Sequence, residues 1–347
     1  IKSYLSGRTQ FVKYAGKNSN DFKVTSGVPQ GSLLGPTLFL IFINDISDAV
    51  GDDIIISLFA DDTKIAKIIR NDDDAIVLQN SICRLQQWCI DNKLNLNIEK
   101  CSVMTISHKK NPILINYSLF DQHLNRVDKQ KDLGIIFNSK LDFKEHLNSI
   151  TAKAYSALGF VKRFSHDLND TSTLKSLFYA LVQSHLEYCN VVWIPTYNVD
   201  INKIESLLRQ FTMFALKEYP NQLNGYQISS YADRLIKHNM STLHRRRINS
   251  AILFTYDLLK GNIHCPKLKE EIEFVSNERN LRNRQFIRLK DSKLQLNTAV
   301  PLTKCCKFAN KLSDSIINST FRGKFKKFLA KTNDEILYDR DLYSFPH

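Results

Sequence analysis

The pattern of apolar and polar positions changes near residue 140 of the chain. Before this point, short runs in which apolar and polar residues alternate, as they do in strands, are mixed with stretches at helical spacing. After it, apolar residues recur every three or four positions, which predicts helices over 142–164, 172–189, 200–217 and 230–260. Beyond residue 265 the pattern weakens and predicts no definite element. We therefore expect a mixed first part and a helical second part.

Within the first part, residues 1–35 have the pattern of a helix end, a short hairpin and a loop. Pro36 then opens a helix whose residues 37–47 are apolar on nearly every side, so we expect it to be buried. A hairpin follows over 53–70, and its first arm is predicted to be a buried apolar strand. The remaining elements expected are an aspartate-capped helix that begins at residue 72 and strands around 94–98, 103–107 and 131–138.

The charge of the chain is distributed unevenly. The 347 residues are 43% hydrophobic and 24% charged, which is ordinary for a globular protein with a sizeable core, and the formal net charge is +13. Residues 1–150 contain 18 Lys and Arg against 17 Asp and Glu, whereas residues 151–347 contain 30 against 18. The second half therefore has the charge of a surface that binds nucleic acid, although membranes and acidic proteins attract the same charge.

The cysteines indicate a protein that works inside the cell. There are seven, without a regular framework or a C-x-x-C motif, which predicts reduced thiols in the nucleus or cytoplasm. Cys305-Cys306 and His264-Cys265 lack the spacing of zinc ligands, so buried thiols are the better interpretation. No apolar run approaches the roughly 20 residues needed to span a bilayer, so no membrane partner is expected. Ile1 begins within an element, as it would in a fragment.

Two adjacent carboxylates, Asp61 and Asp62, fall at the predicted turn of the 53–70 hairpin. Like charges repel and strands disfavour Asp, so packing does not explain the pair. A divalent cation would remove this conflict, because Mg²⁺ prefers a few carboxylate oxygens together with waters and phosphates. Asp is also common in turns that bind nothing. Both interpretations stay open on these residues alone.

A glycine-bounded loop precedes this hairpin by about thirty residues. It runs Gly27-Val28-Pro29-Gln30-Gly31-Ser32 and leads into the apolar helix. Glycine allows another chain or a ligand to approach the backbone closely, and the Gln side chain offers both a donor and an acceptor to a base edge or a sugar. A tight structural turn is the alternative.

Together these motifs resemble those of reverse transcriptases. The loop with Leu34-Gly35-Pro36 and residues 39–45 is similar to motif B, and Phe59-Ala60-Asp61-Asp62 is similar to motif C. Asn97 and Lys100 resemble motif D, and Leu133-Gly134-Ile135 resembles the strand that helps to hold the primer. The similarity is strongest to non-LTR (LINE-type) retrotransposons of the jockey group, which also share residues 1–12 and the segment Leu186-Glu187-Tyr188 to Val192-Trp193 and Pro195. It covers most of residues 1–260.

The resemblance implies an α+β right-hand polymerase that copies an RNA template by adding dNTPs to a DNA primer. The palm would be residues 1–140, the helical thumb 141–260, and a basic C-terminal region 261–347. Asp61 and Asp62 would hold two Mg²⁺ ions, and Lys100 would donate a proton to the leaving pyrophosphate, unless it is only a solvated lysine. The nucleotide and template would contact a set of loop residues, namely Gly27, Pro29, Gln30, Gly31 and Ser32. Leu133 and Gly134 would position the primer.

This sequence departs from the family in one respect. Such enzymes have a further metal-binding Asp, in motif A, upstream of the position that matches Ile1, and the basic fingers also lie upstream. We therefore expect a fragment that is inactive alone. The alternative is a non-catalytic nucleic-acid-binding remnant of a degenerate element. A host RNA-dependent or telomerase-like polymerase would share the palm, but the jockey-like segment at 186–195 argues against it.

Two basic clusters in the second half are candidates for contact with a nucleic-acid backbone. The first is Arg245-Arg246-Arg247, which follows His244 on a predicted helix. Three consecutive residues cannot share one helix face, so some of these side chains are expected to be solvated. The second cluster combines three lysines with interleaved phenylalanines over residues 321–328. Trp88 and Trp193 are expected in the core rather than as stacking platforms.

Overall fold

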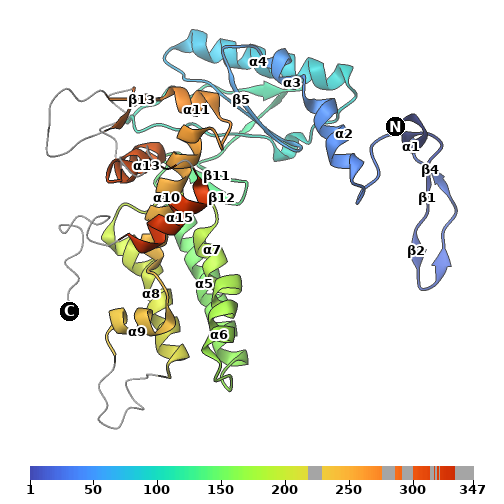
Figure 1. Ribbon diagram of the computed structural model, residues 1–347. Coiled ribbons are helices and arrows are strands. Elements are labelled where there is room, and N and C mark those ends of the chain that lie inside the picture. The colour runs from blue at the N-terminus through green and yellow to red at the C-terminus, as the bar shows by residue number, and fades with distance from the viewer. Residues whose placement is uncertain are drawn as a thin grey trace. The chain divides into compact units, whose positions relative to one another are not determined.

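The computed structural model places helices and small sheets in two compact units, Ile1–Asp128 and Lys129–His347 (Figure 1). It describes residues 1–217, 229–275, 286–290, 300–312, 316, 319 and 321–332. The predicted mixture of helices with small antiparallel sheets is confirmed. The functional boundaries at residues 140 and 260 stay predictions.

The first 50 residues form two short ladders followed by two helices. The elements are α1 (Lys2–Leu5), β1 (Thr9–Gln10), β2 (Lys13–Tyr14), β3 (Lys17–Asn18), β4 (Phe22–Lys23), α2 (Leu34–Ile43) and α3 (Ile46–Val50). Strand β1 pairs with β4 and β2 with β3, both antiparallel, which confirms the predicted hairpin.

Helix α2 is not buried as its composition predicted. Its inner side packs through Phe39 and Ile43 against Trp88, but Leu40 and Ile41 are 55% and 68% exposed. A helix that is apolar all round needs cover on every side, and within its unit α2 is covered on one side only.

The acidic hairpin consists of β5 (Ile55–Phe59) and β6 (Asp62–Ala66), which are antiparallel (Figure 1). Ile56 pairs with Ile65, and both belong to the apolar clusters built around the following helix. Because the side-chain period of a strand is two, Ile55 and Phe59 face the other way, and they are 53% and 62% exposed. The expectation of a fully buried strand is therefore wrong.

Helix α4 (Asp72–Asp91) carries the core of the first unit on its stripe of apolar residues. Its N-cap is Asn71, whose side chain accepts from the Asp74 amide at 3.0 Å, while the Asp74 carboxylate accepts from the Arg70 amide at 2.8 Å. The predicted aspartates thus occupy the first turn, where negative charge complements the helix dipole, one residue after the cap itself.

The rest of the first unit is a set of short elements on this helix. They are the 3₁₀ helix η1 (Ile98–Lys100), β7 (Ser102–Val103), β8 (Ser118–Leu119), β9 (Gln122–His123) and β10 (Asn125–Arg126). Strand β7 runs parallel to β10, while β8 and β9 are antiparallel. The strand predicted over 94–98 is wrong, because its alternating apolar side chains pack against α4 without forming a ladder.

The second unit opens with a tight hairpin of β11 (Lys129–Asp132) and β12 (Ile135–Asn138). The single strand predicted over 131–138 is therefore wrong. Leu133 and Gly134 form the turn with φ of 44° and 86°, and positive values at both central positions are those of a type I′ two-residue turn.

Four predicted helices follow, of which three are confirmed. These are α5 (Lys144–Phe164), the combined α6 (Thr171–Leu177), π-helical η2 (Phe178–Gln183) and α7 (Ser184–Glu187), and α8 (Asn198–Ala215). The single helix predicted over 230–260 is wrong, since α9 (Tyr231–His238) and α10 (Leu243–Lys260) are separate. Asn239 ends α9 in the left-handed conformation, and the Thr242 hydroxyl caps α10.

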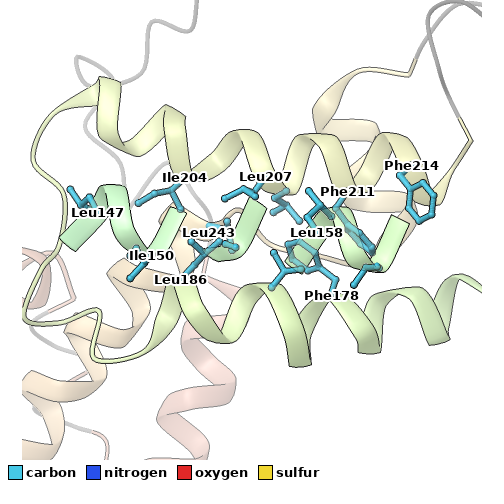
Figure 2. Close-up of a cluster of buried hydrophobic side chains, with 14 of the residues drawn as sticks. Leu147, Ile150, Leu158, Phe178, Leu186, Ile204, Leu207, Phe211, Phe214 and Leu243 are labelled. Carbon is cyan, nitrogen blue, oxygen red and sulfur yellow. The ribbon is translucent and has the colours of Figure 1, made fainter. Parts of the chain in front are cut away.

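Two apolar cores hold this unit together. Helices α5 to α8 bury the first, in which Phe178 and Phe211 stack with ring centroids 4.3 Å apart (Figure 2). Helix α10 packs in the second against α11 (Pro266–Glu270), β13 (Ile272–Phe274), β14 (Ile287–Leu289), α13 (Pro301–Asn310) and α15 (Arg322–Lys331). Trp193 is 1% exposed in the first core, and Trp88 is 8% exposed in the first unit, as predicted.

Replacing Phe211 by Ala should lower the free energy of unfolding of this unit by about 3–5 kcal/mol, because it removes a ring from a fully packed site. Urea titration followed by circular dichroism measures the change. Phe164→Ala is the matched control, since Phe164 is 73% exposed and should cost no more than about 0.5 kcal/mol. Equal effects of the two substitutions would contradict this assignment of the core.

Candidate active site and nucleic-acid interface

The two aspartates lie at the tip of the β5–β6 hairpin. Phe59 pairs with Asp62, so Ala60 and Asp61 are the central residues of the turn, and Asp62 is the first residue of β6. Ala60 has a positive φ of 51°, which glycine usually supplies at the first central position of such turns. Both carboxylates are exposed, and the predicted turn is confirmed.

These two carboxylates supply part of a metal site. Magnesium is bound in proteins by one or two carboxylates together with waters and substrate phosphates, and the Asp61–Asp62 oxygens fit that donor set. Within the ranges that the structure describes, no three His, Cys, Asp or Glu side chains gather to hold an ion. Asp61 and Asp62 therefore lie there without a third metal-binding side chain among the described residues.

The Gly27–Ser32 loop is closed onto the first turn of α2. Gly27 and Gly31 have φ of 77° and 75°, so both need glycine's freedom. The Ser32 hydroxyl donates to the Pro29 carbonyl at 2.7 Å and accepts from the Gly35 amide at 3.0 Å. A Cβ on Gly35 would lie 2.9 Å from the Ser32 oxygen, so only glycine allows this approach.

Arg8 braces the other end of this loop. Its guanidinium donates to the Gly27 carbonyl at 2.6 Å and to the Leu5 carbonyl at 3.3 Å. The loop is thus tied at both ends, and the exposed Gln30 lies between them. The sequence motifs did not include Arg8, and they included Gly35 without a role in the site. Whether Gln30 and Asp61 line one cleft stays a prediction.

Lys100 belongs to the first unit and the Leu133–Gly134 turn to the second, and both are exposed. Lys100 ends η1, a 3₁₀ helix rather than a strand edge, and its neighbour Ile98 packs in the same cluster as Ile65 of β6. Leu133 is 43% exposed, and its carbonyl accepts from the Tyr188 hydroxyl at 2.9 Å. The assigned roles of these residues in proton donation and primer positioning stay predictions.

The three consecutive arginines at the start of α10 are all engaged within the fold. The Arg245 side chain donates to the carbonyls of Leu329, Ala330 and Thr332. The Arg246 guanidinium forms a two-point ion pair with Glu187. Arg247 is 1% exposed and lies over the Trp193 ring at 5.9 Å.

The expectation that some of these arginines are solvated is confirmed for Arg246, whose side chain remains 40% exposed beside Glu187. The side chain of Arg247, in contrast, leaves no surface for a phosphate to contact. The lysines of the second cluster are different, because Lys324, Lys326 and Lys327 are exposed on α15. Phe325 between them is buried and stacks on Tyr256, with centroids 4.6 Å apart.

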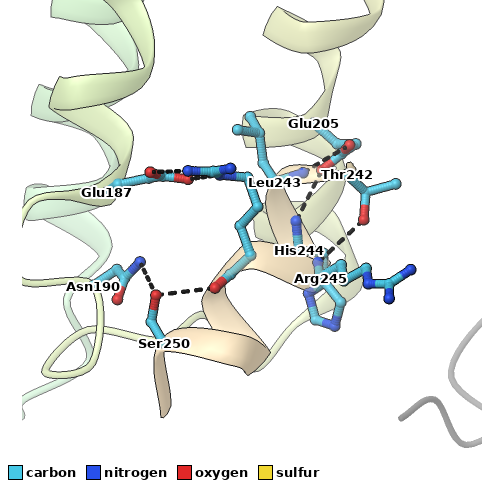
Figure 3. Close-up of polar contacts among 9 residues, drawn as sticks. Glu187, Asn190, Glu205, Thr242, Leu243, His244, Arg245 and Ser250 are labelled. Atoms are coloured by element: carbon cyan, nitrogen blue, oxygen red, sulfur yellow. Dashed lines mark hydrogen bonds and ion pairs between the residues drawn. The ribbon is translucent and has the colours of Figure 1, made fainter. Parts of the chain in front are cut away.

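A buried carboxylate that the sequence did not single out positions α10 (Figure 3). Glu205 of α8 is 3% exposed, and its two oxygens accept from the Leu243 and His244 amides, each at 3.2 Å. The Tyr231 hydroxyl donates to the same carboxylate, and burial together with the Glu205 charge raises the pKa of Tyr231. Burial lowers the pKa of His244 to about 3, and Arg247 and Lys311 add to that shift, so the imidazole is neutral at physiological pH.

Comparison with known proteins agrees with the motifs. The family described as reverse transcriptase (RNA-dependent DNA polymerase) matches residues 1–160, which include the glycine loop, the acidic hairpin and the Leu133–Gly134 turn. Residues 1–160 are therefore similar to the reverse transcriptase family. No solved structure gives a significant match to the chain.

The relatives are proteins of mobile elements. The chain is 31% identical over 160 residues to the RNA-directed DNA polymerase from mobile element jockey of Drosophila melanogaster, a match that covers 43% of the chain and 17% of the relative. It is 26% identical over 280 residues to the probable RNA-directed DNA polymerase from transposon BS of the same species, covering 71% of the chain and 30% of the relative. The resemblance to jockey-like non-LTR elements is confirmed, and the chain spans less than a third of either relative.

Two further sequence expectations concern the surroundings of the protein. All seven cysteines are free thiols, with Cys89, Cys305 and Cys306 buried. Burial raises the pKa of Cys305 and Cys306 to about 12. Among the helices of the described residues, none is both long and apolar enough to cross a membrane.

Gly134→Ala should lower the free energy of unfolding of the second unit by about 1–2 kcal/mol, because a Cβ is strained at φ 86° and would lie 3.3 Å from the Tyr188 ring. Gly323→Ala is the control, since a Cβ there meets nothing within 4 Å and Ala favours a helix. Both are measured by urea titration. A Gly134→Ala protein as stable as the control would contradict the turn geometry.

Proposed function

We propose that the chain is part of an RNA-directed DNA polymerase of a mobile element, which adds dNTPs to a DNA primer on an RNA template. The observation that carries this proposal is the family match over residues 1–160, which spans the tied glycine loop and the Asp61–Asp62 hairpin. Residues 1–140 would serve as the palm, 141–260 as the thumb and 261–347 as a basic extension. A nuclear and cytoplasmic location is part of the proposal, and the free thiols support it.

In this proposal the exposed hairpin tip holds magnesium through Asp61 and Asp62. When bound, magnesium activates the primer hydroxyl and stabilises the charge of the leaving pyrophosphate. Gly27, Pro29, Gln30, Gly31 and Ser32 present a rigid backbone edge and one amide side chain to the nucleotide and template. Leu133 and Gly134 hold the primer strand, and Lys100 donates a proton to pyrophosphate.

A second function is favoured by one observation. Among the described residues no third metal-binding side chain joins the two hairpin carboxylates, which supports a remnant that binds nucleic acid without catalysis. The two proposals differ in what the reading frame encodes upstream of Ile1. An aspartate-bearing strand and basic fingers there would favour the enzyme.

The 347-residue chain alone should not extend oligo(dT) on poly(rA) in the presence of Mg²⁺. Catalytic residues that act as a unit lose nearly all of their rate enhancement when one of them is missing, and the motif A aspartate is not part of this chain. A longer chain that includes the upstream strand should extend the primer, and Asp61→Asn should abolish that extension. Asp72→Asn, on an exposed helix start, is the matched control and should retain activity. Template-dependent extension by the short chain that Asp61→Asn removes would refute the expectation.

Binding to an RNA–DNA hybrid should depend steeply on salt and should reside in the second half of the chain, which carries most of the excess positive charge. Replacing Lys324, Lys326 and Lys327 together by Ala should reduce the slope of log affinity against log salt by about 0.9 for each lysine that contacts phosphate.

The matched control removes the same number of exposed charges from the first unit, at Lys13, Lys17 and Lys23. It should leave the slope nearly unchanged. An equal loss in both triple variants would show a general charge effect, and tighter binding by residues 1–140 than by 141–347 would overturn the assignment of the nucleic-acid surface.

A further inference from the structure

The Leu133–Gly134 turn is held by a side chain from a distant part of the sequence. The Tyr188 hydroxyl donates to the Leu133 carbonyl at 2.9 Å across 55 positions, and the ring covers the open side of Gly134. We propose that Tyr188 is a positioning residue that sets the orientation of this turn against the 3′ end of a primer strand. This proposal rests on the proposed function, because that function assigns the turn to the primer.

The backbone of Tyr188 is held in turn by the buried side chain of Trp193. The Trp193 indole donates to the Tyr188 carbonyl at 2.9 Å, and the buried Trp193 ring meets the His146 ring edge-on at 5.4 Å. His146 in turn accepts from the Ile136 amide of β12 at its Nδ1 atom, at 3.3 Å. The hairpin is thus held at the turn by Tyr188 and along its second strand by His146, and Trp193 supports both contacts.

The exposed fractions of Tyr188 and Leu133 indicate that their contact positions the turn and does not form part of the buried core. Tyr188 is 57% exposed and Leu133 is 43% exposed, so neither contributes much to the buried core. The Tyr188 hydroxyl therefore holds a backbone carbonyl of a turn that is exposed to solvent. Lys131, two residues before the turn, is also exposed and offers a cation to a phosphate beside it. The surface presented by the turn therefore suits a nucleic-acid strand.

The test uses the full 347-residue chain and two matched substitutions. Tyr188→Phe removes only the hydroxyl, whereas Tyr197→Phe makes the same change at a tyrosine that is 65% exposed and outside this network. Hydrogen exchange of residues 129–138 reports on the turn. A recessed RNA–DNA hybrid with 2-aminopurine at the primer 3′ end reports on the primer terminus, and its anisotropy gives the affinity.

Tyr188→Phe should speed amide exchange in the turn roughly three- to tenfold, as the loss of one hydrogen bond predicts. It should also remove at least about half of the change in 2-aminopurine fluorescence that binding of the wild-type chain causes. The affinity should change less than about twofold, because most of the binding free energy comes from phosphate contacts elsewhere. Tyr197→Phe should change neither signal. Gly134→Ala, whose Cβ would lie 3.3 Å from the Tyr188 ring, should also reduce the 2-aminopurine signal.

Three other results would contradict the proposal, each at a different step. Exchange that is equal in the two tyrosine variants would overturn the positioning contact. Faster exchange with an unchanged 2-aminopurine signal would overturn the role toward the primer while leaving the proposed function in place. A wild-type chain that does not bind the hybrid would overturn the proposed function, and this inference with it.

Discussion

The buried carboxylate of Glu205 ties three helices of the second unit to one point. It accepts hydrogen bonds from the first amides of α10 and from Tyr231 at the start of α9, while its own backbone belongs to α8. A buried charge is tolerated only where its oxygens are satisfied, so this set of contacts selects one arrangement of the three helices. With α10 fixed, Arg246 reaches Glu187, and Arg247 lies over Trp193. The contact between Tyr188 and the Leu133 carbonyl is built on that same tryptophan.

Much of the local structure could be predicted from the sequence, because it depends on short-range chemistry. The acidic hairpin, helix α4 and the three helices over 144–215 follow from periodicity and caps that neighbouring residues supply. The prediction of one helix over 230–260 failed although the signals for a break were present. Asn239 suits the left-handed end of a helix and Thr242 suits the next N-cap, and the continuous apolar spacing concealed both.

The failures concerning exposure have a different cause. Periodicity shows which residues are apolar but not which partners cover them, so α2 and β5 were expected to be buried and are largely exposed. The opposite error occurred at Arg247 of α10, which was expected to contact nucleic acid but is buried over Trp193, a residue more than fifty positions away. The motif residues of the candidate site were predicted from the resemblance to reverse transcriptases. Tyr188 and Glu205 act through contacts that no local pattern records.

The open flank of the first unit also determines how this chain behaves in concentrated solution. Helix α2 presents Leu40 and Ile41 to water. The neighbouring β5–β6 ladder has two strands among the described residues, so each strand has an edge whose amides and carbonyls face no further strand of that sheet. Apolar surface next to a free strand edge is a template for pairing with another chain. This flank therefore favours binding of hydrophobic dyes and self-association of the purified chain at high concentration.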